Sequence, residues 1–270
     1  MILINMENAK IKTFQLTKAK ETLFIPLLRR AKDSQSKRSV LHDTRALEII
    51  NAVDYDFSKI KGGSANHTVI RAKQLDEWTK EFIAAHPDAV TVYLGCGLDT
   101  RVTRINPPAT IDWYDVDFPD VIAVKKNFYS DNAHYKMIAS SITDEEWLAQ
   151  VPDNRPTLII ADGVMEYLTA EDVKALLQRL TDRFPQGQMI FDVMGSSAVK
   201  IIAKRYGIHT WGVDDTSEIE RWNPQLKKLD EFPLFQSEYM RLLPFTSRIV
   251  YSVMAVSSKL RSFKVLRYEF

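Results

Sequence analysis

The sequence predicts an α/β fold in which a mainly parallel sheet lies between layers of helices. Between residues 88 and 194, short apolar runs alternate five times with segments of helical periodicity, which is typical of such a sheet. The first apolar run stops at a glycine pair, as at a junction between a strand and a helix. Two β-like runs close the chain with no room between them for a crossover helix, which predicts a final antiparallel hairpin.

Size and composition indicate how many domains the chain forms and argue against nucleic-acid and membrane partners. A chain of 270 residues suits one large domain, or a core domain with a smaller appendage. Thirty-six basic and thirty-five acidic residues give a net charge of +1, which argues against a nucleic-acid surface. No apolar segment approaches the roughly twenty residues needed to cross a membrane, and the N-terminal one is too short for a secretory signal. We therefore expect a cytoplasmic protein with neither a nucleic-acid nor a membrane partner.

Cysteine and histidine usage predicts neither a disulfide nor a metal site. Cys96 is the only cysteine, so no intramolecular disulfide and no thiolate metal site can form. The five histidines show no ligand spacing.

The N-terminal segment reads as a helical cap, residues 1–66, ahead of a core domain, residues 67–270. No glycine occurs before Gly62, and apolar residues recur at helical spacing: Phe14, Leu16, Ala19, Leu23, Leu27 and Leu28. A second short helix is expected around 43–53. A longer helix, about 68–85, then leads the chain into the sheet.

The core elements follow in order. Strands are expected at 90–94, 111–116, 135–139, 157–161 and 189–193, and the closing hairpin at 248–256 and 263–270. Pro119 suits a first helical position. Thr143 with Glu146, and Thr169 with Asp172, resemble capping boxes at helix starts.

The carboxyl ends of parallel strands form the ligand crevice of such folds. The first strand ends at Gly95, Cys96 and Gly97, where glycines let a ligand approach the backbone closely, although an ordinary glycine turn is the alternative. The second strand ends at Asp117, twenty residues after Gly97, the spacing at which a carboxylate reaches a ribose diol. Asp115 and Asp117 could instead bind a metal or cap the following helix.

The other strand ends extend this crevice. Ser141 and Ile142 follow the third strand and could present backbone groups to an adenine edge, and Asp162 follows the fourth. The glycine turn lacks the full G-x-G-x-x-G pattern, and no GK[ST] occurs, so a ligand without a pyrophosphate is favoured. A sheet of five parallel strands that ends in an antiparallel hairpin is the topology of S-adenosylmethionine-dependent methyltransferases. The less favoured alternative is a nicotinamide-dependent oxidoreductase.

Five segments resemble the leucine carboxyl methyltransferase superfamily, in particular its bacterial branch of tetracenomycin-type polyketide O-methyltransferases. They are VIRAKQLDEW (69–78), LGCGLDTRVTRI (94–105), WYDVDFPDVIAVKK (113–126), ADGVMEYLT (161–169) and, more weakly, WGVDD (211–215). The resemblance covers about residues 13 to 235. It implies a class I methyltransferase fold with a seven-stranded sheet, and S-adenosyl-L-methionine as cofactor.

The resemblance also implies roles for single residues. Arg71 would pair with the methionyl carboxylate of the cofactor, a bidentate role that suits arginine. Gly95 would pack against the cofactor, and Asp117 would hold its ribose. Asp162 stands where relatives usually have a glutamate, near the methionyl amine.

At Ser141 the sequence departs from the family, since many members have an aspartate beside the adenine there. The backbone of Ser141 and Ile142 could still serve.

We therefore expect a methyl transfer from S-adenosylmethionine to a carboxylate or hydroxyl of a small-molecule acceptor, for which a polyketide-like compound is a candidate. An ionised carboxylate needs no general base, whereas a hydroxyl does. The sequence identifies no base. Tyr167 is the candidate for a side chain that faces the acceptor. The main alternative is a protein C-terminal carboxyl methyltransferase.

The segment 195–235, rich in Trp, Tyr and Ile, is expected as an inserted roof over the acceptor pocket. Four further polar or aromatic residues in it are more typical of loops or packing than of catalysis: Tyr206, His209, Trp211 and Asp214. The oligomeric state does not follow from the sequence.

Overall fold

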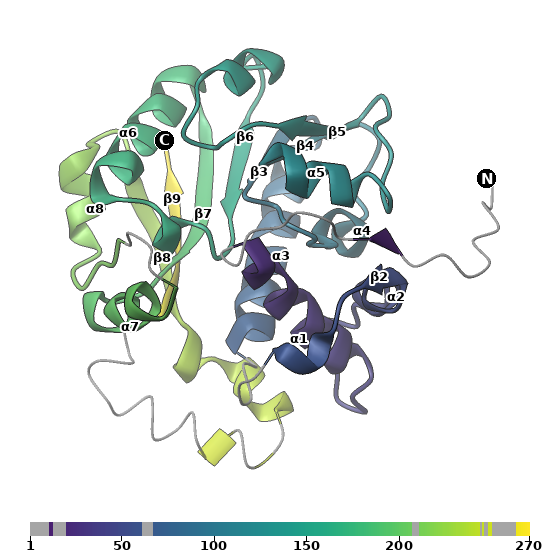
Figure 1. The fold of residues 1–270 in the computed structure, drawn as a ribbon. Helices are drawn as coiled ribbons and strands as arrows, with labels where there is room; N and C mark the ends of the chain where they lie inside the picture. The colour runs from purple at the N-terminus through teal and green to yellow at the C-terminus, as the bar shows by residue number, and fades with distance from the viewer. Residues whose placement is uncertain are drawn as a thin grey trace.

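A seven-stranded sheet forms the centre of the protein (Figure 1). The computed structural model describes residues 11–12, 20–60, 67–206, 211–243, 245, 248–249 and 263–270. The strand order is β5-β4-β3-β6-β7-β9-β8. The first five of these are parallel to one another, and β9 pairs antiparallel with both β7 and β8. The expected fold class is confirmed.

The strands and the sequence prediction agree closely for the parallel part of the sheet. The strands are β3 (Val90–Leu94), β4 (Asp112–Asp117), β5 (Tyr135–Ala139), β6 (Thr157–Ala161), β7 (Gly187–Val193), β8 (Lys227–Pro233) and β9 (Lys264–Glu269). A separate two-stranded sheet pairs β1 (Ile11–Lys12) with β2 (Val53–Asp54). Short apolar runs are local signals, so their positions can be read without knowledge of the partners.

The expected hairpin is wrong in its first strand. The partner of β9 is β8, at residues 227–233, whereas Arg248 and Ile249 are helical and 250–256 lie outside the described residues. Strand β8 is the edge of the sheet, and its first four residues are exposed. Charged side chains suit an edge strand because they discourage pairing with a further strand. They also give the strand a polar sequence that resembles a loop, so its position is not evident from the sequence. Residues 227–233 therefore belong to the sheet and not to the roof expected at 195–235.

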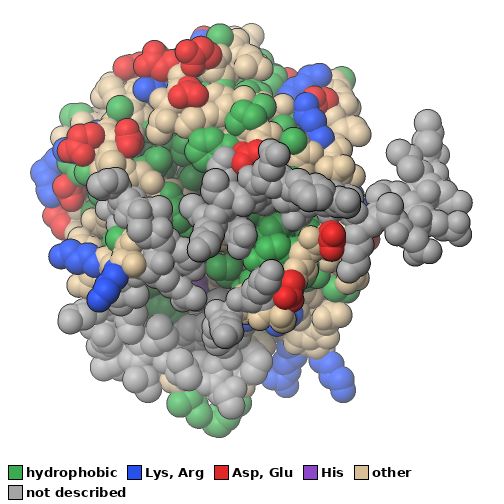
Figure 2. Space-filling view, in the orientation of Figure 1, with side chains coloured by type: hydrophobic (Ala, Val, Ile, Leu, Met, Phe, Trp, Pro, Cys, Tyr) green, Lys and Arg blue, Asp and Glu red, His purple; other side chains and the backbone are tan. Residues whose placement is uncertain are grey.

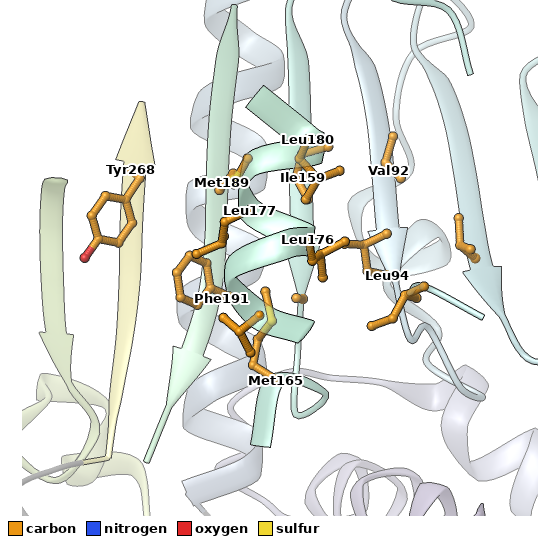
Figure 3. Close-up of a cluster of buried hydrophobic side chains, with 14 of the residues drawn as sticks. Val92, Leu94, Ile159, Met165, Leu176, Leu177, Leu180, Met189, Phe191 and Tyr268 are labelled. Carbon is orange, nitrogen blue, oxygen red and sulfur yellow. The ribbon is translucent and has the colours of Figure 1, made fainter. Parts of the chain in front are cut away.

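Helix α6 (Ala170–Arg183) covers one face of the sheet. It begins at Thr169, whose side chain forms the expected capping box with Asp172. Its apolar stripe faces the sheet, where Leu176, Leu177 and Leu180 pack among side chains of β3, β6 and β7 (Figure 3). The stripe predicted from helical periodicity is thus the core of this layer.

Helices α3 (His67–Ala85), α4 (Arg101–Ile105) and α5 (Pro119–Lys125) belong to the other side of the molecule. Trp78 and Phe82 of α3 share a second buried cluster with Tyr93, Trp113 and Ile160 of the strands. Helix α5 has Pro119 in its first turn, as expected. Both faces of the sheet are therefore buried, as a parallel sheet requires.

Helices α1 (Phe24–Ser34) and α2 (Thr44–Ala52) form a third cluster that includes Leu98, in the loop after β3. Figure 1 shows both helices beyond the carboxyl ends of the central strands. The start of the expected first helix (Phe14, Leu16, Ala19) and the glycine joint near Gly62 lie outside the described residues.

The remaining elements are short. They are α7 (Ser196–Tyr206), α8 (Ser217–Trp222) and the 3₁₀ turns η1 (Lys20–Leu23), η2 (Phe57–Lys59), η3 (Glu146–Gln150), η4 (Met165–Tyr167), η5 (Leu234–Gln236) and η6 (Glu238–Leu242). The capping box expected from Thr143 and Glu146 does not form: η3 begins after Glu145 without a side-chain cap. The Thr143 N–H instead donates to Ser141 Oγ.

Within the described ranges, no helix is long and apolar enough to cross a membrane. On the face seen in Figure 2, acidic and basic side chains are scattered over the surface in small groups. This distribution is consistent with the near-zero net charge.

Candidate functional site

The turn after β3 requires glycine at two positions. Gly95 and Gly97 have φ values of +60° and +51°, in the left-handed region that L side chains avoid. At Gly95 space is short as well, because an added Cβ would lie 2.6 Å from Val164 Cγ2. At Gly97 the nearest atom to an added Cβ, on Leu23, would be 3.7 Å away. Glycine is therefore required at position 95 by both the backbone conformation and the packing, and at position 97 by the backbone conformation alone.

Cys96, between the two glycines, is buried and lies near the backbone of its own turn. Burial raises the pKa of its thiol well above the ordinary value. A protonated, inaccessible thiol is a poor nucleophile. Cys96 therefore acts as a small residue that fits the turn.

Asp117, at the end of β4, links the first two strand ends. Its Oδ2 accepts a hydrogen bond of 2.7 Å from the Gly97 N–H, and its Oδ1 accepts one of 2.7 Å from the Phe118 N–H. Burial raises the pKa of this carboxyl, although both backbone hydrogen bonds oppose the shift. Each carboxylate oxygen can accept more than one hydrogen bond, so Asp117 retains acceptor capacity. The twenty-residue spacing does bring the carboxylate to the glycine turn.

Asp115 has a different environment from Asp117. Its carboxylate lies 2.7 Å from Lys125 Nζ and accepts hydrogen bonds from Trp113 Nε1 and Tyr135 OH. The Asp115–Lys125 pair is fully buried. No group of three or more potential metal ligands occurs within the described residues. Asp115 is thus part of a packed ion pair, and the metal alternative finds no support.

The turn after β5 lies beside the end of β4, since the Ser140 N–H donates to the Asp117 carbonyl. Ser141 Oγ lies 2.8 Å from Thr143 Oγ1 and accepts the Thr143 N–H. Ile142 is buried in the cluster under α6. The Ser141 side chain therefore shapes this turn, whose backbone lies next to Asp117.

Arg71, on α3, is held by two carboxylates at the ends of two further strands. Its Nε lies 2.5 Å from Asp162 Oδ1, and its Nη1 lies 2.6 Å from Asp192 Oδ2. Asp192 Oδ1 accepts the Gly163 N–H, and an added Cβ at Gly163 would lie 2.5 Å from Arg71 Nη2. Glycine at 163 thus leaves room for the guanidinium.

The pKa values around Arg71 follow from burial and charge. Burial works against ionisation of Asp162, but Arg71 and Arg101 outweigh it and hold the pKa of that carboxyl below its usual value. For Asp192, burial dominates and raises the pKa, with Arg71 opposing. One carboxylate of the pair is therefore firmly ionised, and the other is less so.

A chain of buried ion pairs continues from Asp162 to the N-terminal helices. Arg101 Nη2 lies 2.7 Å from Asp162, and Arg101 Nε lies 2.7 Å from Asp76 of α3. Arg104 pairs in turn with Asp76 and with Asp43, which caps α2. Helices α1 and α2 are thereby connected to the carboxyl end of β6 through charge as well as apolar packing.

Glu166 and Tyr167 lie in η4, directly after the end of β6. Tyr167, the predicted acceptor-facing side chain, is half-buried. Glu166 is only 6% exposed, and its Oε2 has no hydrogen-bond partner among the described residues. Burial, followed by the charge of Asp192, raises the pKa of Glu166 to about 8.

Sequence reasoning missed Asp192, Arg101, Asp76 and Glu166 as members of this site. Asp192 lies inside the fifth predicted strand, near its carboxyl end, so an inventory of all strand ends would have included it. Arg101 lies within the LGCGLDTR segment. Asp76 and Glu166 likewise lie within VIRAKQLDEW and ADGVMEYLT, two other segments that carry the family resemblance.

The late candidates do not join this cluster within the described residues. Trp211 is buried and packs against Trp222, with ring centroids 5.6 Å apart. Asp214 accepts the Ser196 N–H at the start of α7. His209 and the side chain of Tyr206 lie outside the described residues.

The sheet order, the glycine turn and Asp117 at the end of β4 together define a class I S-adenosylmethionine-dependent methyltransferase. Solved structures share this fold. One is the N-methyltransferase NodS from Bradyrhizobium japonicum WM9 in complex with S-adenosyl-L-homocysteine, which is 13% identical with a TM-score of 0.51, over 83% of this chain and 96% of that one.

The model of the family described as leucine carboxyl methyltransferase matches residues 24–181, more than half of the chain. The tetracenomycin polyketide synthesis O-methyltransferase TcmP of Streptomyces glaucescens is 35% identical over 96% of this chain and 99% of its own length. The S-adenosyl-L-methionine-dependent methyltransferase dpfgK of Gibberella zeae is 32% identical over 78% of this chain and 81% of its own length. The chain belongs to the leucine carboxyl methyltransferase family and is an S-adenosylmethionine-dependent O-methyltransferase.

Proposed function

We propose that this enzyme methylates an oxygen of a small-molecule acceptor, in the crevice at the carboxyl ends of the parallel strands. The observation that carries the proposal is the meeting of the glycine turn, Asp117, Arg71 and Asp162 at one edge of the sheet. The similarity to TcmP over nearly the full length of both chains supports a small acceptor of the polyketide type.

The described residues fit S-adenosylmethionine. This cofactor carries an ammonium, a sulfonium and one carboxylate, so it brings one net positive charge at neutral pH. Around Arg71 the site offers three buried carboxyl groups, Asp162, Asp192 and Glu166, which is an acidic excess even when Arg101 is included. Charge complementarity of this kind favours a positively charged ligand.

Six of the eight predicted cofactor-binding residues contact the cofactor in this proposal. Arg71 binds the methionyl carboxylate, and Asp162 receives the methionyl amine. Asp117 accepts from the ribose hydroxyls with its remaining lone pairs. Gly95 packs against the cofactor as part of the left-handed turn, and the backbone of Ser141 and Ile142 lines the adenine side.

When bound, the cofactor supplies a methyl group on a sulfonium, which is open to displacement by an oxygen nucleophile. The residues of the protein position the acceptor and exclude water. An acceptor carboxylate is already ionised at pH 7, whereas a phenol has an ordinary pKa of about 10 and requires a base. Tyr167, next to the end of β6, is the proposed contact with the acceptor.

Binding of S-adenosylmethionine by isothermal calorimetry tests the cofactor site. We expect Asp117→Ala and Arg71→Ala each to weaken binding tenfold or more, which is about 1.4 kcal/mol. Glu145→Ala is a matched control, because the Glu145 side chain is 76% exposed and its ion-pair partner among the described residues is the half-buried Arg179. Arg71→Lys is included because it keeps a positive charge between Asp162 and Asp192 if the alanine variant unfolds. Folded variants with unchanged affinity would contradict the placement of the site.

The acceptor class requires a second experiment. Transfer of a labelled methyl group is measured with a panel of small aromatic acids and phenols, and separately with peptides that end in a free carboxylate. We expect label in the small molecules. Label in the peptides alone would favour the protein C-terminal carboxyl methyltransferase instead.

A further inference from the structure

Glu166 is a buried acidic side chain to which the proposed binding and transfer steps assign no role. It lies in η4, between the end of β6 and α6. Its Oε2 is inaccessible and lacks a hydrogen-bond partner among the described residues. A buried, unsatisfied carboxyl oxygen has a free-energy cost of about 1–3 kcal/mol or more, so its presence beside the proposed cofactor site calls for an explanation.

The charged groups around Glu166 come from three other elements. Asp192 of β7 and Asp162 at the end of β6 are like charges, and Arg71 of α3 is the opposing one. Arg71 already pairs with both aspartates, and Arg101 adds a second cation only on the Asp162 side.

The next groups outward do not supply a counter-charge. His67 lies one helical turn before Arg71, and its burial near Arg71 lowers its pKa to about 4, so it is neutral. Burial raises the pKa of Tyr93 well above its ordinary value, so that phenol is neutral too. Among the described residues, two cations therefore face three carboxyl groups, and Glu166 is the carboxyl group that forms no ion pair with them.

We propose that the protonation state of Glu166 changes with the charge of the bound cofactor. The carboxyl group holds a proton while no ligand is bound, and it releases this proton when the positively charged methyl donor binds. The inference rests on the proposed function of this site. The released proton goes to solvent, and the ionised Glu166 becomes the third carboxylate opposite the two cationic groups of the donor. After transfer the cofactor is a thioether with no net charge, so Glu166 takes a proton from solvent again.

This exchange would make Glu166 a specificity-determining residue. It strengthens binding of the sulfonium donor, S-adenosylmethionine, relative to the thioether product, S-adenosylhomocysteine. The preference depends on pH, because the proton must leave for the counter-charge to appear. With a pKa of about 8 in the free protein, most of Glu166 is protonated at pH 7.

Calorimetry of both ligands at pH 7, in buffers with different ionisation enthalpies, counts the protons released on binding. For the wild-type protein we expect binding of S-adenosylmethionine to release most of one proton, and binding of S-adenosylhomocysteine to release less. In Glu166→Gln, which mimics the protonated state at nearly the same size, we expect this release to disappear. Between pH 6 and 8 the donor's affinity should rise with pH in the wild type more steeply than in the variant.

The cofactor's own amine titrates equally in the wild type and in Glu166→Gln. The difference between the two proteins therefore contains only the protons that Glu166 releases. Glu171→Gln, an exposed position in the first turn of α6, is the matched control and should behave as the wild type. Equal proton release by wild type and Glu166→Gln, or by donor and product in the wild type alone, would overturn the inference while leaving the methyl-donor site intact. Failure of the wild type to bind S-adenosylmethionine would instead overturn the proposed function.

Discussion

The two glycines of the turn after β3 allow backbone strain and steric overlap to be separated by substitution. Gly95→Ala and Gly97→Ala place the same methyl group on residues with nearly the same φ, +60° and +51°. Only at Gly95 does the new Cβ overlap a neighbour, with Val164 Cγ2 at 2.6 Å and Val164 Cβ at 2.9 Å. At Gly97 the space is open beyond ordinary contact.

The expected magnitudes follow from these distances. A left-handed conformation costs a non-glycine residue about 1–2 kcal/mol, so Gly97→Ala should lower the free energy of unfolding by that amount. Gly95→Ala has the same strain and adds overpacking, which costs about 1–3 kcal/mol. Val164 follows Gly163 in the loop after β6, and only its side chain can move cheaply. We expect Gly95→Ala to be destabilised by a total of about 2–5 kcal/mol.

Urea unfolding followed by circular dichroism measures both values. The double variant Gly95→Ala/Val164→Ala removes both Cγ atoms, the nearer at 2.6 Å, and should recover part of the difference between the two single variants. The strain common to both glycines should remain. Equal destabilisation by Gly95→Ala and Gly97→Ala, or no recovery in the double variant, would refute the assignment of the excess to Val164.

Two further predictions concern buried titratable groups. Lys125→Met leaves Asp115 buried without its cation, so the free energy of unfolding should fall by about 3–5 kcal/mol. Adding Asp115→Asn should restore most of this loss. A double variant whose loss equals the sum of the two single losses would contradict the pairing. Burial lowers the pKa of His67 to about 4, below its unfolded value of about 6.5, so the unfolded state binds more protons between these pH values and stability is lost as pH falls through this window. The urea midpoint should therefore drop more between pH 7 and 5 in the wild type than in His67→Gln, and equal drops would exclude His67 as the cause.

The parallel part of the sheet and the first strand ends could be predicted because their signals are local. Apolar runs, the glycine pair and the Thr169 capping box each depend on residues a few positions apart. The contact of Asp117 with the Gly97 N–H was also predictable, since neighbouring parallel strands with a short crossover fix how far apart their ends lie.

The outer strand β8 and the ion pair between Arg71 and Asp192 could not be predicted in this way. Pairing of β8 with β9 joins residues on either side of a long connection, and an exposed, charged edge strand has no apolar pattern to mark it. The Arg71–Asp192 ion pair joins residues 121 positions apart. No spacing rule covers such a pair.

The sequence by itself determined the fold class, the family resemblance and the methyl donor, because these depend on short motifs and on the order of elements. Only the tertiary structure decided how the charges of the site combine. The side chains of Arg71, Asp162, Asp192 and Glu166 are all buried, and in that environment the protonation of each group depends on the charges of the others. The protonation of Glu166, on which the proposed preference for the sulfonium donor rests, therefore depends on the assembled cluster and not on any single residue.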